Sequence, residues 1–187
     1  MNHDFEIYDG VLNKYHGSDQ NVVIPGDVTK IGSSAFEDCR TMLSVEIPEG
    51  VTTIGRFAFF GCQRLADVKL PESLTTIEEK AFRDCSALED IAFPDGITHV
   101  AGDAFEGCYY LEEITIFGEV FSIEEMMEEY DSGEIAEDFD IDEDEICNLT
   151  EAVHDVAVSE LVQLLINGKS ENLYMPEDLR DELKQNL

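Results

Sequence analysis

Four sets of residues recur along this chain at one fixed interval, the distance from Pro25 to Pro48. The four sets keep a constant offset from one another, and each is called a row. The rows are Pro25, Pro48, Pro71 and Pro94; Cys39, Cys62, Cys85 and Cys108; Ala35-Phe36, Ala58-Phe59, Ala81-Phe82 and Ala104-Phe105; and Ile31, Ile54, Ile77 and Val100. The interval lies within the periods of about 20–50 residues that are typical of solenoids, whose units stack because none can bury its apolar face alone. The chain is therefore predicted to be an α/β repeat solenoid.

Each unit begins with a short run in which polar and apolar residues alternate. Residues two apart in a strand share a face, so Val45 and Ile47 are predicted to point inward and Ser44 and Glu46 outward. A proline then ends the strand because it cannot donate to a ladder. A turn follows, and a short helical or 3₁₀ segment carries the Ala-Phe pair inward. Stacked at about 4.8 Å a rung, the rows become continuous buried ridges.

The repeat divides the sequence into four regions. Residues 1–18 are predicted to form an N-terminal β-hairpin cap, with its turn at Asp9-Gly10. Residues 19–123 form the solenoid, with full rungs to about residue 110 and a partial rung after it. Residues 124–146 are predicted to be an acidic linker with a short helix, and residues 147–187 a C-terminal α-helical appendage.

The repeat unit resembles a known family. The stretch EIPEGVTTIGRFAFFGC at 46–62 is similar to the BspA-type leucine-rich repeat, whose unit has a strand ending in I-P, a V-x-x-I-G stretch, an A-F pair and a cysteine. LADVKLPESLTTIEEKAFRDCSA at 65–87 follows the same pattern, and the resemblance covers about 5–123. It implies a right-handed leucine-rich-repeat β solenoid that contacts other proteins. Many members of this family are secreted adhesins of bacteria.

Charge restricts the partners that this chain can bind. Its 43 acidic residues outnumber its 11 basic ones, giving a formal net charge of −32. Such a surface repels nucleic acid and anionic lipid, so the predicted partner is a protein, with a basic surface favoured. No apolar run approaches the ~20 residues that span a bilayer. The N-terminus lacks the pattern of a secretory signal, which favours a cytoplasmic location; a cell-surface protein with its signal removed is the alternative.

The acidic segment has two interpretations. Residues 124–145 contain 13 acidic residues and no basic one, as a solvated linker would. The alternative is a calcium site made by Asp138, Asp140, Asp142 and Asp144. However, an EF-hand loop starting at Asp138 requires Gly at position 143 and Glu at position 149, where this chain has Glu and Leu.

Two amphipathic helices are predicted beyond the acidic segment. The first spans about 149–167, where Leu149, Val153, Val156, Leu161, Leu164 and Leu165 follow helical spacing. The second begins at Pro176. Their apolar stripes have to be buried. The helices either pair with each other or seal the end of the solenoid, or they form a homodimer interface or a docking site for a partner helix.

The cysteines of the repeat are predicted to be packing residues. Side chains that run parallel at about 4.8 Å are too far apart for a disulfide and cannot converge on zinc. Cys147 lies outside the repeat and is predicted to be a free thiol. The sequence contains no nucleophile elbow, phosphate-binding loop or H-E-x-x-H motif, so we predict no enzymatic activity and no cofactor.

The remaining candidates lie on the surface. Solenoids bind partners through the outward positions of their sheets, and exposed aromatic residues often anchor such contacts. The candidates on the sheet are Ser44, Glu46, Asp67, Lys69, Asp90, Ala92, Glu113 and Thr115. The aromatic candidates Phe57, Phe60, Tyr109 and Tyr110 lie at loop positions, where local packing is the alternative. The predicted function is a protein–protein interaction scaffold; the alternatives are an adhesin, a cation-binding protein or an enzyme with an unrecognised site.

Overall fold

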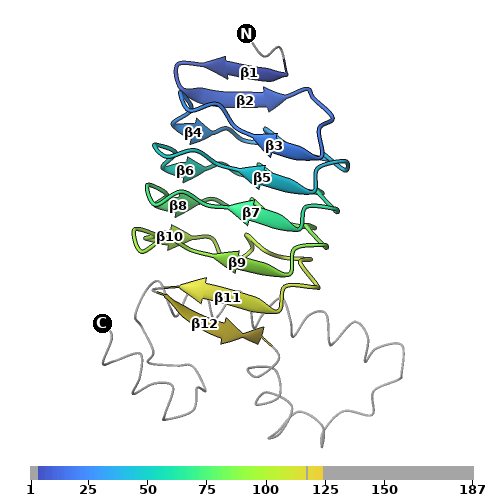
Figure 1. The fold of residues 1–187 in the computed structure, drawn as a ribbon, viewed down its shortest axis with the longest axis vertical. Helices are drawn as coiled ribbons and strands as arrows, with labels where there is room; N and C mark the ends of the chain where they lie inside the picture. The colour runs from blue at the N-terminus through green and yellow to red at the C-terminus, as the bar shows by residue number, and fades with distance from the viewer. Residues whose placement is uncertain (1–3, 117, 124–187) are drawn as a thin grey trace, which may run out of the picture.

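The fold is a stack of short strands, which a computed structural model describes for residues 4–116 and 118–123. Each turn of the chain contributes a longer strand and then a short one, and equivalent positions such as Thr52 and Thr75 lie 23 residues apart (Figure 1). The strands are β1 Phe5–Tyr8, β2 Val11–Tyr15, β3 Asn21–Val23, β4 Lys30–Ile31, β5 Ser44–Glu46, β6 Thr53–Ile54, β7 Asp67–Lys69, β8 Thr76–Ile77, β9 Asp90–Ala92, β10 His99–Val100, β11 Glu113–Ile116 and β12 Glu119–Ser122.

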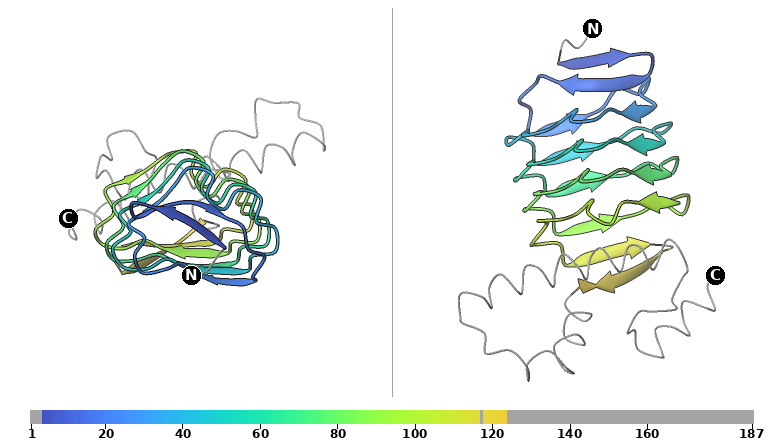
Figure 2. Two further views of the ribbon diagram at one scale, coloured as in Figure 1. Left: turned by 90° about the horizontal axis from the view of Figure 1, so that it is seen from above. Right: turned by 180° about the vertical axis from the view of Figure 1, so that it is seen from behind.

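Strands of successive turns pair parallel, whereas β1 with β2 and β11 with β12, at the two ends of the described stack, pair antiparallel. One sheet has the order β1-β2-β4-β6-β8-β10, and the other side of the coil carries two three-stranded sheets, β3-β5-β7 and β9-β11-β12. Equivalent residues pair directly, as Lys30 does with Thr53 and Val45 with Val68. Seen along the stack, successive turns superimpose around a common interior (Figure 2). The predicted β solenoid is therefore confirmed.

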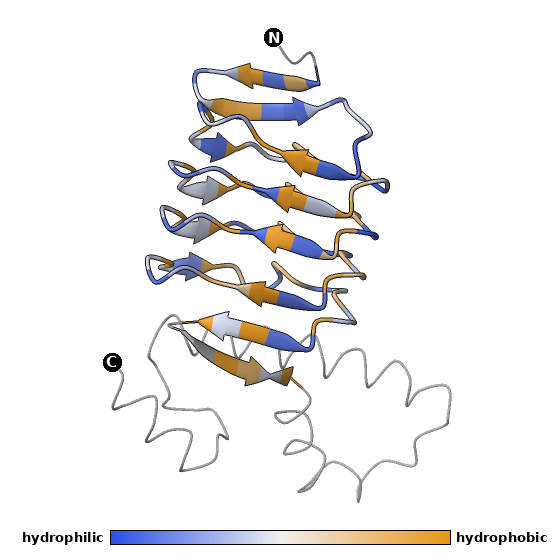
Figure 3. Cartoon of the chain, in the orientation of Figure 1, coloured by the Kyte–Doolittle hydropathy of each residue, from blue (hydrophilic) through white to orange (hydrophobic). Residues whose placement is uncertain are grey.

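The interior consists of the rows that the repeat predicts. Val45, Ile47, Ile54 and Phe59 are buried, and apolar residues alternate with polar ones along the strands (Figure 3). The Phe row is a continuous stack: ring centroids lie 4.9 Å apart for Phe36 and Phe59, 5.0 Å for Phe59 and Phe82, and 5.2 Å for Phe82 and Phe105. Because the rung spacing matches the distance at which aromatic rings stack, one residue type in each rung builds the thickest part of the core.

The prediction of helical or 3₁₀ segments at the Ala-Phe pairs is wrong for the described rungs, where these segments are successive turns. Their backbone N–H groups alternate between two kinds of partner. Those of Ala35 and Glu37 close turns on Gly32 and Ser34 of their own rung, whereas that of Phe36 donates to Ala58 in the next rung. Positive φ angles at Ser34 (57°) and Asp38 (59°) orient the backbone so that alternate N–H groups point to the next rung. A helix would satisfy those groups within its own rung, and the hydrogen bonds that this segment makes to the next rung would be lost.

The glycine of the V-x-x-I-G stretch has a packing role at Gly55. A Cβ atom there would lie 2.8 Å from the carbonyl oxygen of Ile31 and 2.9 Å from backbone atoms of Gly32 and Ser33. Backbone atoms cannot move aside as a flexible side chain can, so a side chain at residue 55 would require the preceding rung to shift. The Gly55 N–H donates to Ile31, but the equivalent Glu78 and Ala101 N–H groups donate to Ile54 and Ile77 in the same way, so the hydrogen bond itself does not depend on glycine.

The N-terminal end of the stack is closed by a β-hairpin. Strands β1 and β2 pair antiparallel through a turn at Asp9 and Gly10, both with positive φ, as a two-residue hairpin turn requires. Strand β2 then pairs parallel with β4 and so continues the sheet. The ring of Tyr15 lies 5.2 Å from Phe36 and 5.0 Å from Phe5, which extends the aromatic stack into the cap.

A seam divides the outer side of the stack between β7 and β9. Hydrogen bonds join β5 to β7 and β9 to β11, but no bond between β7 and β9 occurs in the described chain. Leu70 is only half-buried there, whereas its equivalents Ile47 and Phe93 are buried. The two sides of the seam remain joined through β8 and β10 and through the Phe row.

Several predictions lie outside the described residues. They are the acidic linker with its short helix at 124–146, the calcium candidates Asp138, Asp140, Asp142 and Asp144, the thiol of Cys147, and the C-terminal α-helical appendage at 147–187. These stay predictions.

Candidate binding surface

The outward positions of the sheets form two rows along one side of the stack. The first row contains Ser44 and Asp67 across from each other, and beyond the seam Asp90 opposite Glu113. The second contains the pairs Glu46 with Lys69 and Ala92 with Thr115. All eight predicted positions are exposed or half-buried. The structure therefore places the predicted sheet residues together on one surface, which we call the outer face.

The first row of the outer face is acidic at Asp67, Asp90 and Glu113. Asp90 and Glu113 are direct cross-strand neighbours, and like charges in that arrangement destabilise a sheet by up to about 1 kcal/mol. None of the three has an ion pair among the described residues. A positively charged partner would reduce the repulsion between these carboxylates, which no ion pair among the described residues reduces.

Sequence reasoning missed two apolar residues on this side. Val23 is 66% exposed and pairs with Glu46, so it extends the second row at the N-terminal end. Val120 is 61% exposed and lies opposite Thr115 on β12. The alternation in 21–24 carries the signal for Val23, but the continuous apolar run Val22-Val23-Ile24 conceals it. The described outer face is thus acidic along one row and apolar at both ends of the other.

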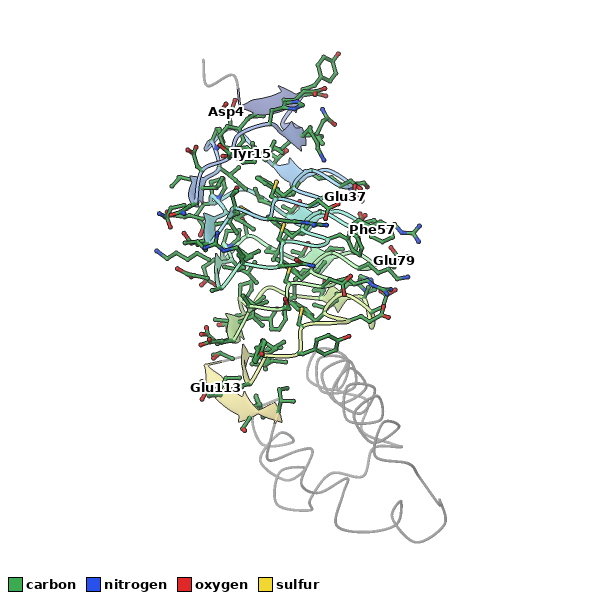
Figure 4. The ribbon with its side chains drawn as sticks, turned by 90° about the vertical axis from the view of Figure 1, so that its right-hand side faces the viewer. Asp4, Tyr15, Glu37, Phe57, Glu79 and Glu113 are labelled. Atoms are coloured by element: carbon green, nitrogen blue, oxygen red, sulfur yellow. The ribbon has the colours of Figure 1, made fainter. Side chains whose placement is uncertain are left out.

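The aromatic candidates Phe57 and Phe60 lie on the turn side of the coil. Their rings meet edge to face at 5.7 Å, the Arg56 guanidinium lies 5.2 Å from the Phe57 centroid, and the Lys80 ammonium lies 6.0 Å from it. In Figure 4, Phe57 projects from the same side as Glu37 and Glu79, away from Glu113. Both phenylalanines are half-buried. Local packing thus occupies much of their surface.

The backbone at Phe57 is set by the fold. Its φ of 56° is unusual for an aromatic residue, but Ser34 and Lys80 at the equivalent positions have values of 57°. The Phe57 N–H donates to the carbonyl of Glu79 in the next rung, as the Ser34 N–H does to Arg56. The left-handed conformation therefore serves the stacking of rungs and is no sign of a functional site.

Tyr109 and Tyr110 lie at the turn that follows the last cysteine of the row. They are 45% and 65% exposed. Their equivalents one rung earlier, Ser86 and Ala87, are small. The tyrosines belong to rung positions different from those of Phe57 and Phe60, so the sequence-predicted aromatic residues form two pairs and no single cluster.

The cysteines of the repeat have the environment of packing residues. Cys62, Cys85 and Cys108 are buried, and each thiol donates to a carbonyl oxygen in the preceding rung, at 3.1 Å, 3.2 Å and 3.1 Å for Phe36, Phe59 and Phe82. Burial raises the pKa of the Cys85 thiol well above its ordinary value. Burial, with Cys62 nearby, raises the pKa of half-buried Cys39 to about 11. A nucleophilic cysteine requires the opposite shift.

The described ranges offer no cluster of metal ligands. Residues 4–116 and 118–123 contain no group of three or more His, Cys, Asp or Glu side chains arranged to hold a metal ion. In the same part of the chain, no helix has the length and apolar character that crossing a bilayer would need.

A coil of stacked turns with apolar rows inside and polar rows outside is a solenoid, the architecture that leucine-rich-repeat proteins share. Residues 6–131 match the profile of the BspA type leucine rich repeat region, in six copies. The chain belongs to this family, as the motif at 46–62 indicates. No curated protein shows significant similarity to it.

Solved structures of leucine-rich-repeat proteins from bacteria resemble the fold. A leucine-rich cell surface protein of Faecalibacterium prausnitzii is 36% identical, with a TM-score of 0.53 over 56% of this chain and 28% of that one. A Bacteroides capillosus leucine-rich repeat protein is 32% identical, with a TM-score of 0.53 over 61% of this chain and 93% of the other. The pneumococcal vaccine antigen PcpA is 27% identical, with a TM-score of 0.52 over 58% and 27%. The match thus spans less than a third of the Faecalibacterium and pneumococcal chains.

Proposed function

We propose that this chain is a non-enzymatic protein-interaction module that binds a basic protein surface through its outer face. The observation that carries the proposal is the acidic row Asp67, Asp90 and Glu113, in which strand pairing holds Asp90 directly opposite Glu113. The row has no cationic partner among the described residues. The backbone that carries these side chains is already ordered in strands, so binding need not order it, which favours affinity.

The chemistry of the partner follows from the charge of the chain. A formal net charge of −32 repels anions at long range and speeds encounters with cationic surfaces. The apolar residues Val23 and Ala92 lie in the row beside the acidic one. A partner with lysine or arginine beside small apolar side chains therefore fits this face best.

The proposed location is the cell surface. Two of the similar proteins are described as a cell surface protein and a vaccine antigen. The N-terminal sequence favoured the cytoplasm, and these similar proteins do not support that prediction. Protease treatment of intact cells of the native host tests the location. A surface protein is degraded while the cells remain intact, whereas protection until lysis would contradict this part of the proposal.

Charge reversal on two faces of the stack tests the binding role. The outer-face variant is Asp67→Lys/Asp90→Lys/Glu113→Lys. The matched control is Glu49→Lys/Glu72→Lys/Asp95→Lys, which changes three exposed acids beside the proline row by the same total charge. Immobilised wild-type and variant proteins are exposed to host surface extracts, and bound proteins are quantified by mass spectrometry at two salt concentrations.

The expected result is a partner that the wild type and the control retain and the outer-face variant loses. Its binding should weaken as salt rises, because charges at an interface rim are screened. Equal capture by all three proteins would overturn the assignment of the outer face. Loss in both variants would show that total charge, and no particular face, determines binding.

A further inference from the structure

The outer side of the described stack lacks a set of hydrogen bonds at the boundary between β7 and β9. Across the boundary before it, the Ile47 N–H donates to Lys69 at 3.1 Å, and across the boundary after it the Phe93 N–H donates to the next strand at 2.8 Å. The Leu70 N–H is their equivalent in the repeat, and it makes no bond to Ala92 in the described chain. The seam thus interrupts a ladder that is regular on both sides of it.

Burial of the inner side chains also falls at the seam. Val68 on β7 is 8% exposed, whereas its equivalents Val45 and Ile91 are each 1% exposed. Leu70, just beyond the same strand, is half-buried. Water therefore reaches the edge of the core between β7 and β9. Closing the gap would bury more of both side chains, and the hydrophobic effect favours that movement.

The same rung boundary is joined on the other sides of the coil. In Figure 1, β8 and β10 lie side by side in one column of strands, and β7 and β9 lie in the other. The Ala101 N–H, just after β10, donates to Ile77 on β8 at 3.0 Å, and the Arg83 guanidinium forms an ion pair with Glu106 at 2.7 Å. The Phe row also continues across this boundary. Movement at the seam is therefore a rotation about the joined sides, because these contacts prevent the rungs from separating.

Negative charges lie on both sides of the seam. Asp67 on β7 and Asp90 on β9 are equivalent positions of the acidic row, and both are exposed. Neither carboxylate has an ion pair among the described residues, and neither does Lys69, whose equivalent across the seam is Ala92. In the paired strands β9 and β11 the ladder holds like charges together. At the seam no ladder opposes the repulsion, so charge can change the width of the gap.

We infer that the seam is a hinge with an open and a closed state, and that a cationic group spanning Asp67 and Asp90 closes it. In the closed state the Leu70 N–H donates to Ala92 and completes the ladder, and the structure shows the open state. The hinge rests on the hydrogen bonds and burial of described rungs. Only the identity of the cation as a basic protein rests on the proposed function. Such a partner, bound across the seam, would fix the angle between the two parts of the stack.

Hydrogen exchange of the Leu70 amide in the full chain tests the hinge, because this N–H is bonded only in the closed state. The variant Asp67→Asn/Asp90→Asn removes the like charges at the seam. The control Glu72→Gln/Asp95→Asn removes two exposed carboxylates at the same rung boundary, beside the proline row. Pentalysine serves as the probe for a spanning cation. Exchange is followed by NMR at low salt, where charge effects are least screened.

Protection of the Leu70 amide should rise about twofold to fivefold in the asparagine variant, the range expected when like charges on adjacent strands are removed. Pentalysine should produce a similar rise in the wild type and little in the variant, and the control should match the wild type. Unchanged protection in the variant would overturn the hinge, as would an equal rise at the Ile47 and Phe93 amides, which reports global stability. A wild type that ignores pentalysine would overturn closure by cations. None of these outcomes requires a native partner, so failure of the proposed function stays distinguishable.

Discussion

Replacing Phe82 with alanine tests the central packing claim, because this ring lies in the middle of the aromatic stack. It is fully buried, with Phe59 at 5.0 Å on one face and Phe105 at 5.2 Å on the other. The lost transfer free energy is about 1.5–3 kcal/mol for a phenylalanine side chain. A residual cavity on the order of 100 Å³ adds about 2.4 kcal/mol at 24 cal/mol per Å³, for a total of about 4–5 kcal/mol.

Urea unfolding followed by circular dichroism measures this loss. Phe57→Ala is the control: the same chemical change at a half-buried ring of the adjacent rung should cost about 1–2 kcal/mol, because part of that ring is already in water. Phe82→Leu should recover more than half of the loss by refilling the cavity. If Phe82→Ala costs no more than Phe57→Ala, the stacked row does not hold the rungs together and the packing argument is wrong.

Three further predictions follow from the backbone, the thiols and the acidic segment. In hydrogen exchange, the Leu70 and Asp90 amides at the seam should exchange faster than the Ile47 amide, which donates to Lys69; equal rates would contradict the seam. Folding raises the pKa of the Cys39 thiol from 9.0 to about 11, so stability should fall as pH rises from about 9 to about 11 and should not depend on this thiol at lower pH. In thermal melts, Cys39→Ala should flatten the slope of stability against pH in that window, and an unchanged slope would refute the shift. In calorimetry, micromolar calcium should give no saturable heat, because Glu143 and Leu149 replace the required glycine and glutamate; saturable heat lost in Asp138→Asn/Asp140→Asn would establish the site.

The sequence predicts which positions lie on the candidate surface, but it does not predict which contacts their side chains make. The two-residue period of a strand places Asp67 and Glu113 outside and Val68 and Ile114 inside, whatever the partner. The repeat interval already places Asp90 beside Glu113, and the structure confirms that pairing. That neither carboxylate has an ion pair among the described residues is shown only by the folded chain. The exposure of Val23 and the packing of Arg56 on Phe57 are likewise tertiary contacts.

The repeat itself determined most of the core. When every turn has the same length and each rung stacks in register, Phe36 must meet Phe59 and Cys62 must follow Cys39, because identical positions have identical surroundings. That argument requires only spacing and residue type, and the continuous ring stack confirms it. The hairpin at Asp9-Gly10 could also be predicted from sequence, because the two turn residues themselves favour the positive φ angles that the turn requires.

Tertiary structure decided how the backbone satisfies its hydrogen bonds. The Ala-Phe segments look helical from sequence because apolar pairs with polar flanks suit a short helix, yet the Phe36 N–H pairs with Ala58 in the next rung. The seam between β7 and β9 likewise interrupts a pattern that runs unbroken through both strands. Hydrogen bonds between rungs join residues that are a full turn apart in the chain, so their partners exist only once the stack has formed.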